Sequence, residues 1–345
     1  MPHRIALIPG DGIGKEVIPA ACRVLDRVAK LEYTEFPWGS ECYLSDGRMM
    51  PEDGLEQLRP SDAILLGAVG DPQVPDHVTL NGLLLPIRRG FDQYACVRPS
   101  YYYPGTQSPL ARPKPGEIDF IVVRENTEGE YANVGGHVYE KMKDEVAVQT
   151  AVFTRHGTER IIRFAFELAS GRRKRLTSVT KSNAQGYGMV FWDRVFRDVA
   201  RDYPGVATES LLVDAACMDL VRRPEHFDVM VASNLFGDIL TDIGAMVSGS
   251  LGLAPSANLN PERKFPSMFE PVHGSAPDIA GKGIANPLAA ILSGAMMLDH
   301  LGEKKAAAAI ESAVRAVLAE GRALTRDLGG SAGTSECTAA VLEKL

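Results

Sequence analysis

The sequence predicts an α/β protein built on a largely parallel sheet. Two observations support this expectation: short apolar runs of strand length recur along the chain, and runs with apolar residues at helical spacing alternate with them. Strands and helices that alternate in this way pack as a sheet covered by helices. A length of 345 residues suggests either two domains or one large α/β domain.

The first strand is expected at 4–8, and a glycine-rich turn at 10–14 leads into a helix at 15–30. Further strands are expected at 63–66, 120–123, 176–180, 211–213 and 229–232. Further helices are expected at 159–169, 189–200, 235–247, 287–301 and 303–318. The segment 249–286 is rich in Gly, Pro, Ser and Asn and is expected to be mostly irregular, which in a compact protein favours a functional loop.

One segment departs from this alternation. Residues 134–139 and 145–153 alternate apolar and polar side chains, and a short charged link joins them, which predicts a β-hairpin. The hairpin carries few long apolar residues, and an isolated two-stranded hairpin is marginally stable in water. It is therefore expected to rest against a partner surface, such as a second subunit.

The composition is that of an ordinary globular protein. Hydrophobic residues make up 45% and charged residues 23% of the chain, and the net charge is −7. No long block of one charge occurs, so neither nucleic acid nor a membrane surface is an expected partner. No run of about 18 apolar residues occurs either, so no transmembrane helix is expected. Five widely spaced cysteines without a C-x-x-C pair favour a reducing compartment, the cytoplasm.

The glycine turn is weak evidence for a nucleotide site. Gly10, Gly12 and Gly14 have the spacing G-x-G-x-G and not the G-x-G-x-x-G of Rossmann domains, so a plain strand-to-helix turn is favoured. No Walker A pattern occurs, which argues against phosphoryl transfer by a P-loop.

Three aspartates form a candidate metal site. Asp238 and Asp242 are four residues apart in a predicted helix, so their carboxylates share one face. Asp214 closes a predicted strand upstream. Three carboxylates suit a hard octahedral cation such as Mg²⁺ or Mn²⁺, whereas no His or Cys stands at metal-ligand spacing. The alternative is that the helical pair only supplies negative charge that favours the helix dipole.

Basic and hydroxyl side chains supply a candidate substrate site. Arg88, Arg98 and Arg124 can each pair with a carboxylate, and Arg124 follows a predicted strand, where ligands of α/β sheets bind. Lys181 follows another predicted strand and can serve as a base, and Tyr131 can deliver a proton. A structural role stays open for each of them: a surface ion pair for the arginines, an exposed loop for the lysine and core packing for the tyrosine.

Four segments resemble one enzyme family. Residues 9–16 (PGDGIGKE), 124–131 (RENTEGEY), 234–242 (NLFGDILTD) and 270–278 (EPVHGSAPD) are similar to motifs of the metal-dependent β-decarboxylating dehydrogenases. This family includes isocitrate, isopropylmalate, homoisocitrate and tartrate/D-malate dehydrogenases. The segments follow one another in the family's order over nearly the whole chain, so the resemblance is specific.

The resemblance implies a fold other than the Rossmann fold. It implies the isocitrate/isopropylmalate dehydrogenase-like fold, in which two α/β domains share a central sheet. The large domain, on the dinucleotide side, would comprise residues 1–98 and 249–345. The small domain would comprise residues 99–248, with a dimer arm at about 134–153.

The resemblance also implies an assembly and a set of site roles. The assembly is a homodimer with shared active sites, in which Lys181 and Asp214 enter the site of the neighbouring subunit. Mg²⁺ or Mn²⁺ would be held by Asp214, Asp238 and Asp242, and the acid–base pair would be Lys181 and Tyr131. The substrate would contact Arg88, Arg98, Arg124, Leu84 and Asn81. The dinucleotide would contact Ile13, His273, Gly274, Ser275, Ala276, Asp278 and Asn286.

The expected dinucleotide is NAD. Asp278 and Ile279 stand in the adenosine loop, where NADP-specific relatives carry Lys-Tyr. A carboxylate at this place hydrogen-bonds a ribose 2′-hydroxyl and repels a 2′-phosphate.

Within the family, the chain looks most like tartrate and D-malate dehydrogenases. The second motif ends in Gly129-Glu130-Tyr131 and departs from the Gly-Gly-Ile-Tyr of isopropylmalate dehydrogenases. Residues 83–85 are leucines and lack the Ser and Asn with which isocitrate enzymes bind a third carboxylate. Residues 153–155, 164–169 and 257–263 look most like tartrate/D-malate enzymes. Asn81 stands where those relatives have a bulky aromatic residue and can instead hydrogen-bond a C3 hydroxyl, which would suit tartrate.

The expected activity is therefore NAD-dependent and divalent-metal-dependent oxidation and β-decarboxylation of D-malate, to pyruvate and CO2, or of tartrate. A 3-isopropylmalate dehydrogenase is the first alternative, because a leucine wall alone tolerates an isopropyl group. The second alternative is a non-catalytic regulatory subunit of an isocitrate-type dehydrogenase, which the presence of Lys181, Tyr131 and the three aspartates disfavours.

Overall fold

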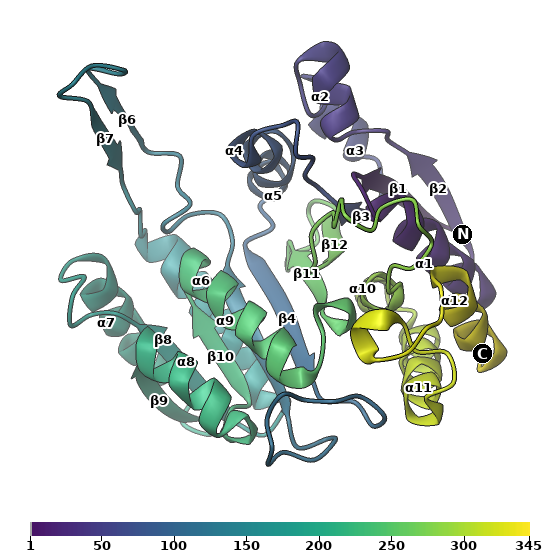
Figure 1. Cartoon of the computed structure of the whole chain (residues 1–345). Coiled ribbons are helices and arrows are strands. Elements are labelled where there is room, and N and C mark those ends of the chain that lie inside the picture. The colour runs from purple at the N-terminus through teal and green to yellow at the C-terminus, as the bar shows by residue number, and fades with distance from the viewer. Residues whose placement is uncertain (1) are drawn as a thin grey trace.

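The computed structural model describes residues 2–345, and a mixed sheet of ten strands within that range forms its centre (Figure 1). From one edge to the other, the strands are β2 (Leu31–Glu35), β1 (His3–Gly10), β3 (Ala63–Ala68), β12 (Ser267–Pro271), β11 (Pro255–Leu259), β4 (Ala95–Tyr101), β5 (Asp119–Glu125), β10 (Val229–Ala232), β8 (Arg175–Thr180) and β9 (Ala207–Leu212). The two ends of the chain thus build one half of the sheet, and the middle of the chain builds the other half.

The expectation of a largely parallel sheet is confirmed: the two outer parts of the sheet are parallel, and only its centre is antiparallel. Strands β2, β1, β3 and β12 pair in parallel, and so do β5, β10, β8 and β9. Between these blocks, β11 and β4 pair antiparallel with each other and with their outer neighbours. The sheet is therefore two parallel blocks joined through two antiparallel strands.

The predicted helices are confirmed, with shifts of a few residues at their ends. They are α1 (Gly14–Val28), α6 (Arg155–Ser170), α7 (Gly188–Ala200), α9 (Asn234–Ser248), α10 (Leu288–His300) and α11 (Lys304–Glu320).

Shorter helices were not predicted, because most of them span too few residues to show a periodicity. They are α2 (Ser40–Asp46), α3 (Gly54–Leu58), α4 (Asp76–Thr79), α5 (Leu85–Gly90), α8 (Val213–Arg222) and α12 (Thr334–Glu343), with a π-helical turn at Leu80–Leu84 and the 3₁₀ turns Pro224–His226, Leu251–Leu253 and Arg326–Leu328.

The segment 249–286 is mostly irregular, as expected, but it also contributes two strands that were not expected, β11 and β12, to the middle of the sheet. These strands carry buried polar residues such as Ser256, Asn258 and Glu270 in place of an apolar pattern, and each of the three side chains is hydrogen-bonded in the interior. The strand expected at 211–213 ends at Leu212, and a new helix begins at the next residue.

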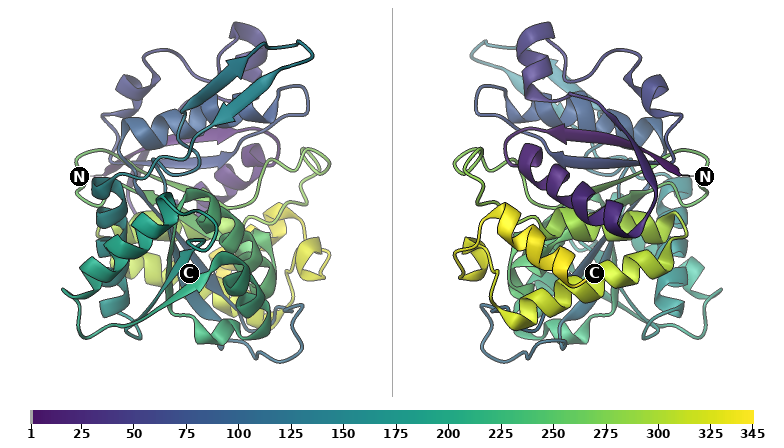
Figure 2. Two further views of the ribbon diagram at one scale, coloured as in Figure 1. Left: turned by 90° about the vertical axis from the view of Figure 1, so that its left-hand side faces the viewer. Right: turned by 90° about the vertical axis from the view of Figure 1, so that its right-hand side faces the viewer.

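The cores show how the helices cover the sheet. Successive residues of β3 point to opposite faces: Ala63 and Leu65 join a core with α1, α10 and α11, whereas Ile64 and Leu66 join a second core on the other face. The first helix, α1, lies beside α10 and α12, which come from the other end of the chain (Figure 2). A third core consists of buried residues between 94 and 247. We propose that the chain divides into a large domain at 1–98 and 249–345 and a small domain at 99–248, which this distribution of cores supports.

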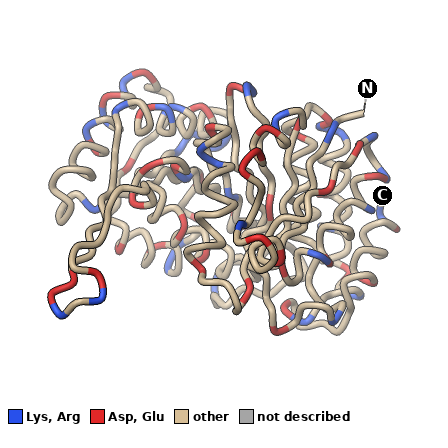
Figure 3. Tube along the Cα trace, turned by 90° about the horizontal axis from the view of Figure 1, so that it is seen from above, with Lys and Arg blue, Asp and Glu red and all other residues tan. Residues whose placement is uncertain are grey.

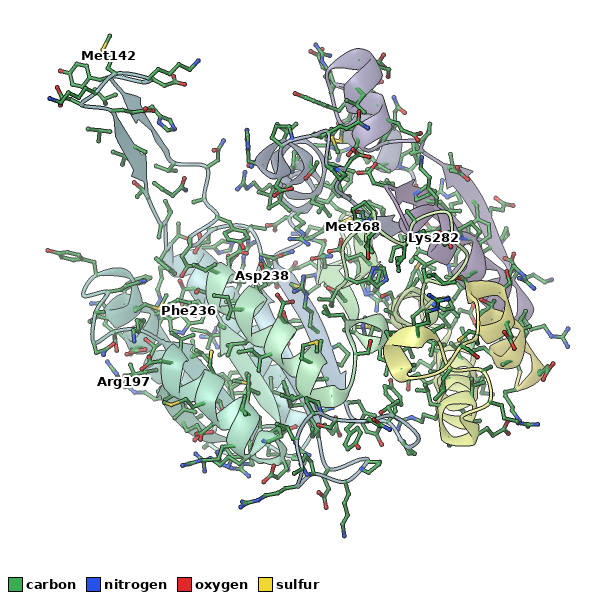
Figure 4. All side chains as sticks on the ribbon, viewed as in Figure 1. Met142, Arg197, Phe236, Asp238, Met268 and Lys282 are labelled. Carbon is green, nitrogen blue, oxygen red and sulfur yellow. The ribbon has the colours of Figure 1, made fainter. Side chains whose placement is uncertain are left out.

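The predicted hairpin is confirmed. Strands β6 (Gly135–Val138) and β7 (Val146–Gln149) pair antiparallel as a separate two-stranded sheet. The hairpin projects from the body of the protein (Figure 1), with Met142 at its tip (Figure 4). Basic residues lie next to the tip, with acidic residues on either side of them (Figure 3). Every residue of both strands is exposed. Val138 pairs with Val146, and Val148 lies two residues further along the strand, so the three valines share one face of the hairpin and are exposed to solvent.

Across residues 2–345, no helix combines the length and the apolar character that crossing a membrane requires.

Candidate active site

A cavity of about 170 Å³ lies over the centre of the sheet. Its walls come from the ends of β3 and β12 and the residues that follow them, from β4 and β5, from the π-helical turn at Leu80–Leu84, and from α5 and α9. It is lined by the three candidate arginines and by Tyr131, Asp238, Glu270, Leu84, His273 and Gly274. Pockets for drug-sized ligands measure roughly 300–1,000 Å³, so this cavity suits a small molecule.

Arg88 is buried on α5 and is held by a residue from the far end of the chain. Its Nη2 donates a hydrogen bond to Glu270 Oε1 at 2.6 Å, and Asn258 Nδ2 donates to the same oxygen at 2.8 Å. Within the described residues, the buried Nε of Arg88 has no hydrogen-bond partner. Since a buried donor without a partner is unfavourable, this N–H group is available to a bound anion.

Three side chains converge on Asp238, which lies near the start of α9 (Figure 4). Arg98 Nη1 lies 3.2 Å from Asp238 Oδ1, and Arg124 Nη1 donates to the same oxygen. Tyr131 Oη donates to Asp238 Oδ2 at 2.8 Å. Burial would raise the pKa of Asp238, but Arg124 and Arg98 outweigh it and hold this pKa below its ordinary value. The carboxylate is therefore ionised and oriented.

Tyr131 is fixed by more than its hydroxyl. Arg89 Nη2 donates to the Tyr131 carbonyl oxygen at 2.5 Å, and the Arg124 guanidinium lies 5.3 Å from the centre of the tyrosine ring. Burial, followed by the charge of Asp238, raises the pKa of Tyr131, so its hydroxyl keeps its proton at neutral pH. Sequence analysis did not single out Arg89, and the only signal in the sequence is its position next to Arg88.

Asp242 lies one turn after Asp238 on the same helix, as predicted, and is exposed. Partial loss of hydration beside the protein surface, followed by the charge of Asp238, raises the pKa of Asp242. Two carboxylates at this spacing are the hard oxygen donors that Mg²⁺ and Mn²⁺ prefer, so the pair fits a divalent cation. Within residues 2–345, no group of three or more His, Cys, Asp and Glu is placed to hold a metal ion. Further ligands would have to come from substrate, water or another chain.

Lys181 and Asp214 lie together but are not among the residues that line the cavity. Lys181 Nζ pairs with Asp214 Oδ1 at 2.5 Å, and this hydrogen bond lowers the pKa of the carboxyl group. Asp214 does not close a strand, as was expected, but stands in the first turn of α8. The pair is partly exposed, so both groups are accessible from outside this chain.

Two of the expected dinucleotide residues, Ile13 and Ser275, meet at the first glycine turn. Ile13 N donates to the Ser275 carbonyl oxygen at 2.8 Å. Gly12 has a φ of +50°, and a Cβ atom there would lie 2.1 Å from the same oxygen, so this contact requires glycine. The turn thus packs directly against Ser275, although the spacing of the glycines is not that of a Rossmann domain.

The side chains of His273 and Asn286 differ in whether their polar atoms have a partner. His273 Nε2 is buried and has no partner within residues 2–345, and burial lowers the pKa of this histidine, so it is neutral. Asn286 Nδ2 donates to Asp327 at 2.9 Å, which adds Asp327 to the residues that sequence analysis missed. The remaining expected residues, Gly274, Ala276 and Asp278, lie in the same segment, and Asp278 is exposed.

The expected apolar wall is only partly in place. Leu84 lines the cavity, together with Leu80 and Val69, which were not predicted. Asn81 does not line it: this residue is exposed, and its Nδ2 donates to the His77 carbonyl oxygen at 2.8 Å. The π-helical turn at Leu80–Leu84 sets the directions of the Leu80, Asn81 and Leu84 side chains. The irregular residue spacing of this turn could not be anticipated from the sequence.

A larger hollow of about 690 Å³ lies elsewhere, along residues 110–117 and 221–225. None of the candidate site residues lines this hollow. Its larger volume therefore does not make it a better candidate for the active site than the cavity over the sheet.

Comparisons with known proteins show which proteins the chain is similar to. Residues 4–341 match the family described as isocitrate/isopropylmalate dehydrogenase. The chain is 52% identical to a probable tartrate dehydrogenase/decarboxylase of Agrobacterium vitis, over 99% of this chain and 98% of that protein. It is 53% identical to a D-malate dehydrogenase (decarboxylating) of Escherichia coli strain K12, over 98% of this chain and 97% of that protein. Among solved structures, isocitrate dehydrogenase from Methylococcus capsulatus superposes with a TM-score of 0.91 at 37% identity, over 99% of both chains.

Proposed function

The chain belongs to the isocitrate/isopropylmalate dehydrogenase family, and on that premise we propose that it is an NAD-dependent and divalent-metal-dependent oxidoreductase that oxidises and decarboxylates D-malate or tartrate. The observation that carries the proposal is the charge of the cavity. Three buried guanidinium groups line the cavity, and they outnumber the two carboxylates that also line it, those of Asp238 and Glu270. The surplus of positive charge in a small buried space favours a compact dianion, which is what a 2-hydroxy dicarboxylic acid is at neutral pH.

The three arginines, Lys181 and Tyr131 each have a role in the proposed chemistry. Arg88, Arg98 and Arg124 would bind and orient the two carboxylates of the substrate. Lys181 would accept the proton of the C2 hydroxyl group. Tyr131, whose hydroxyl keeps its proton, would deliver that proton to the carbon that loses CO2. When bound, NAD supplies the hydride acceptor, and a divalent cation held by Asp238, Asp242 and Asp214 of the partner subunit supplies a Lewis acid.

The assembly proposed with this function is a homodimer with shared active sites. Exposed apolar side chains flank the aspartates of two adjacent helices: Met218 and Val221 with Asp214 on α8, and Ile239 and Met246 with Asp242 on α9. Burying these faces against a second copy would bring aspartates of two chains together. The exposed valines of the β6–β7 hairpin form a second surface that a partner subunit would cover. The five cysteines, which are free in the described residues, fit the proposed cytoplasmic location.

A substrate panel tests the proposal. With Mn²⁺ and NAD⁺, we expect kcat/KM to be highest for D-malate or tartrate, lower for 3-isopropylmalate and lowest for isocitrate. Isocitrate should be poor because its third carboxylate would lie unpaired against Leu80 and Leu84, which costs several kcal/mol. A preference for isocitrate would refute this reading of the cavity.

A second candidate function is 3-isopropylmalate dehydrogenase. The wall of Leu80, Leu84 and Val69 favours it, because these side chains can pack against an isopropyl group. Apolar pockets discriminate such groups by only about 1–3 kcal/mol per methylene. The highest kcat/KM for isopropylmalate in the same panel would establish this function instead.

The enzyme is expected to prefer NAD⁺ to NADP⁺. Asp278 is exposed in the dinucleotide segment, and its carboxylate would repel a ribose 2′-phosphate. Two like charges about 4 Å apart repel by roughly 1–4 kcal/mol, so Asp278→Ala should reduce the preference about tenfold or more. The measurement is the ratio of kcat/KM for the two cofactors. The assignment is wrong if the wild type prefers NADP⁺ or if the substitution leaves the ratio unchanged.

Tyr131→Phe is expected to lower kcat by about 100- to 10,000-fold, with little change in substrate affinity. The variant keeps the ring beside Arg124 but removes the hydroxyl that would protonate the product carbon. Single-turnover kinetics and equilibrium substrate binding separate the two effects. If substrate binding weakens and the chemical steps keep their rates, Tyr131 serves binding and not proton transfer.

A further inference from the structure

The helix that carries Asp238 and Asp242 begins without a cap of its own. The first N–H groups of a helix have no partner within it, and helix ends fray when nothing holds them. In α9, the side chain of Ser233 does not cap the helix, and its first turn contains no acidic residue. Asp238 lies only one turn after the first residue, Asn234. The position of its carboxylate therefore depends on whatever holds that first turn.

Glu130 supplies the missing cap from another part of the chain. Its Oε2 accepts a hydrogen bond from Leu235 N at 3.1 Å, and its Oε1 accepts one from Ser233 Oγ at 2.8 Å. A carboxylate at this end of a helix also interacts favourably with the helix dipole. One side chain thus satisfies a free N–H group and supplies the negative charge that the helix lacks.

The next residue, Tyr131, holds the same helix one turn further on, through its hydrogen bond to Asp238 Oδ2 at 2.8 Å. Asn234 Nδ2 adds a third contact, to the Glu128 carbonyl oxygen at 3.1 Å. The 128–131 segment and the first turns of α9 therefore form one unit. The acid–base tyrosine and the metal-binding face of the helix are placed relative to each other by this unit.

We propose that Glu130 is a positioning residue for the metal site: by capping α9 it fixes the two aspartates in the arrangement that a divalent cation requires. This inference rests on the metal site of the proposed function. Glu130 would not touch the metal, the substrate or the dinucleotide, so it acts only through the helix. Partners that orient metal ligands typically contribute about 10- to 100-fold to metal affinity.

Glu128 offers a matched control in the same loop. Its carboxylate accepts hydrogen bonds from Thr154 N at 2.9 Å and from Thr154 Oγ1 at 2.8 Å, at the start of α6. Helix α6 carries none of the candidate site residues. Glu130→Ala and Glu128→Ala would therefore each remove a carboxylate that accepts hydrogen bonds at the start of a helix. Only the helix that Glu130 contacts, α9, carries Asp238 and Asp242.

The test is Mn²⁺ binding to the complete protein without substrate or dinucleotide, measured from the electron paramagnetic resonance signal of free Mn²⁺. Glu130→Ala is expected to weaken binding by about tenfold or more, and Glu128→Ala to leave it unchanged. Glu130→Gln should keep most of the affinity, because an amide can accept from Leu235 N and donate to Ser233 Oγ. Glu130→Asp keeps the charge but shortens the reach, so it should weaken binding.

Each result decides between explanations. Equal losses in Glu130→Ala and Glu128→Ala, or no loss in either, would overturn the inference. If Glu130→Gln binds as weakly as Glu130→Ala, the residue acts by its charge and not by holding the helix, which also overturns it. Should Glu130→Ala fail to fold, wild-type affinity in Glu130→Asp overturns the inference and weaker binding supports it. A wild-type protein that binds no Mn²⁺ would instead refute the metal site of the proposed function.

Discussion

Lys181→Met is expected to reduce turnover of the preferred hydroxy acid by about 100- to 10,000-fold while the protein stays folded. Methionine keeps the length of the side chain but cannot accept the hydroxyl proton. The substitution also breaks the ion pair with Asp214, but both side chains are partly exposed, at 28% and 57%. Exposed pairs of this kind contribute at most about 1 kcal/mol, so the loss of activity would not reflect unfolding.

Lys344→Met is the matched control. Lys344 also pairs with a carboxylate, that of Glu320, and its side chain is 30% exposed, close to the value for Lys181. It lies near the C-terminus, away from the cavity. Wild-type turnover is expected for this variant. If Lys181→Met also turned over like the wild type, another group would have to be the base.

A mixture of two inactive variants tests whether the sites are shared. In a dimer of one Lys181→Met chain and one Tyr131→Phe chain, shared sites combine both intact residues in one site and both substitutions in the other. Random re-association makes about half of the dimers mixed, so roughly a quarter of the wild-type activity should return. If each chain used its own Lys181, every site would carry one substitution and no activity would return.

The elements that could be predicted from the sequence are those with a local signal. Helix α9 was predictable because its apolar residues recur at helical spacing, and this placed Asp238 and Asp242 on one face. The hairpin was predictable from alternation over a few residues. The resemblance to the family predicted that Arg88, Arg98 and Arg124 belong to one site, and the structure places all three at one cavity.

What could not be predicted depends on contacts between distant parts of the chain. Glu270 balances the charge of Arg88, and 182 positions separate them in the sequence. Strands β11 and β12 are stabilised by buried polar contacts that leave no apolar pattern. The direction of the Asn81 side chain follows from the π-helical turn in which this residue lies. The sequence of leucines at 83–85 does not reveal that turn.

Asp242→Asn is expected to weaken Mn²⁺ binding and to lower activity while leaving stability almost unchanged. Asp242 is exposed, so an amide in its place leaves no buried charge uncompensated. Each carboxylate removed from such a site weakens its hold on a divalent cation, here by at least about tenfold. Removing the metal with EDTA should abolish the activity of the wild type. Undiminished activity after EDTA treatment would show that this reaction needs no divalent cation.

Asp238→Asn is expected to lower both metal affinity and stability, which makes it the less clean test. Asp238 is the counter-charge of Arg98 and Arg124, whose side chains are only 9% and 2% exposed. An amide oxygen there is a weaker acceptor, and a buried donor left poorly satisfied costs about 1–3 kcal/mol, more when it is charged. The free energy of unfolding in urea should therefore fall by about 1–3 kcal/mol relative to Asp242→Asn. If the two variants unfold with the same free energy, the aspartate does not offset the arginines, and the charge balance assigned to the cavity would have to be revised.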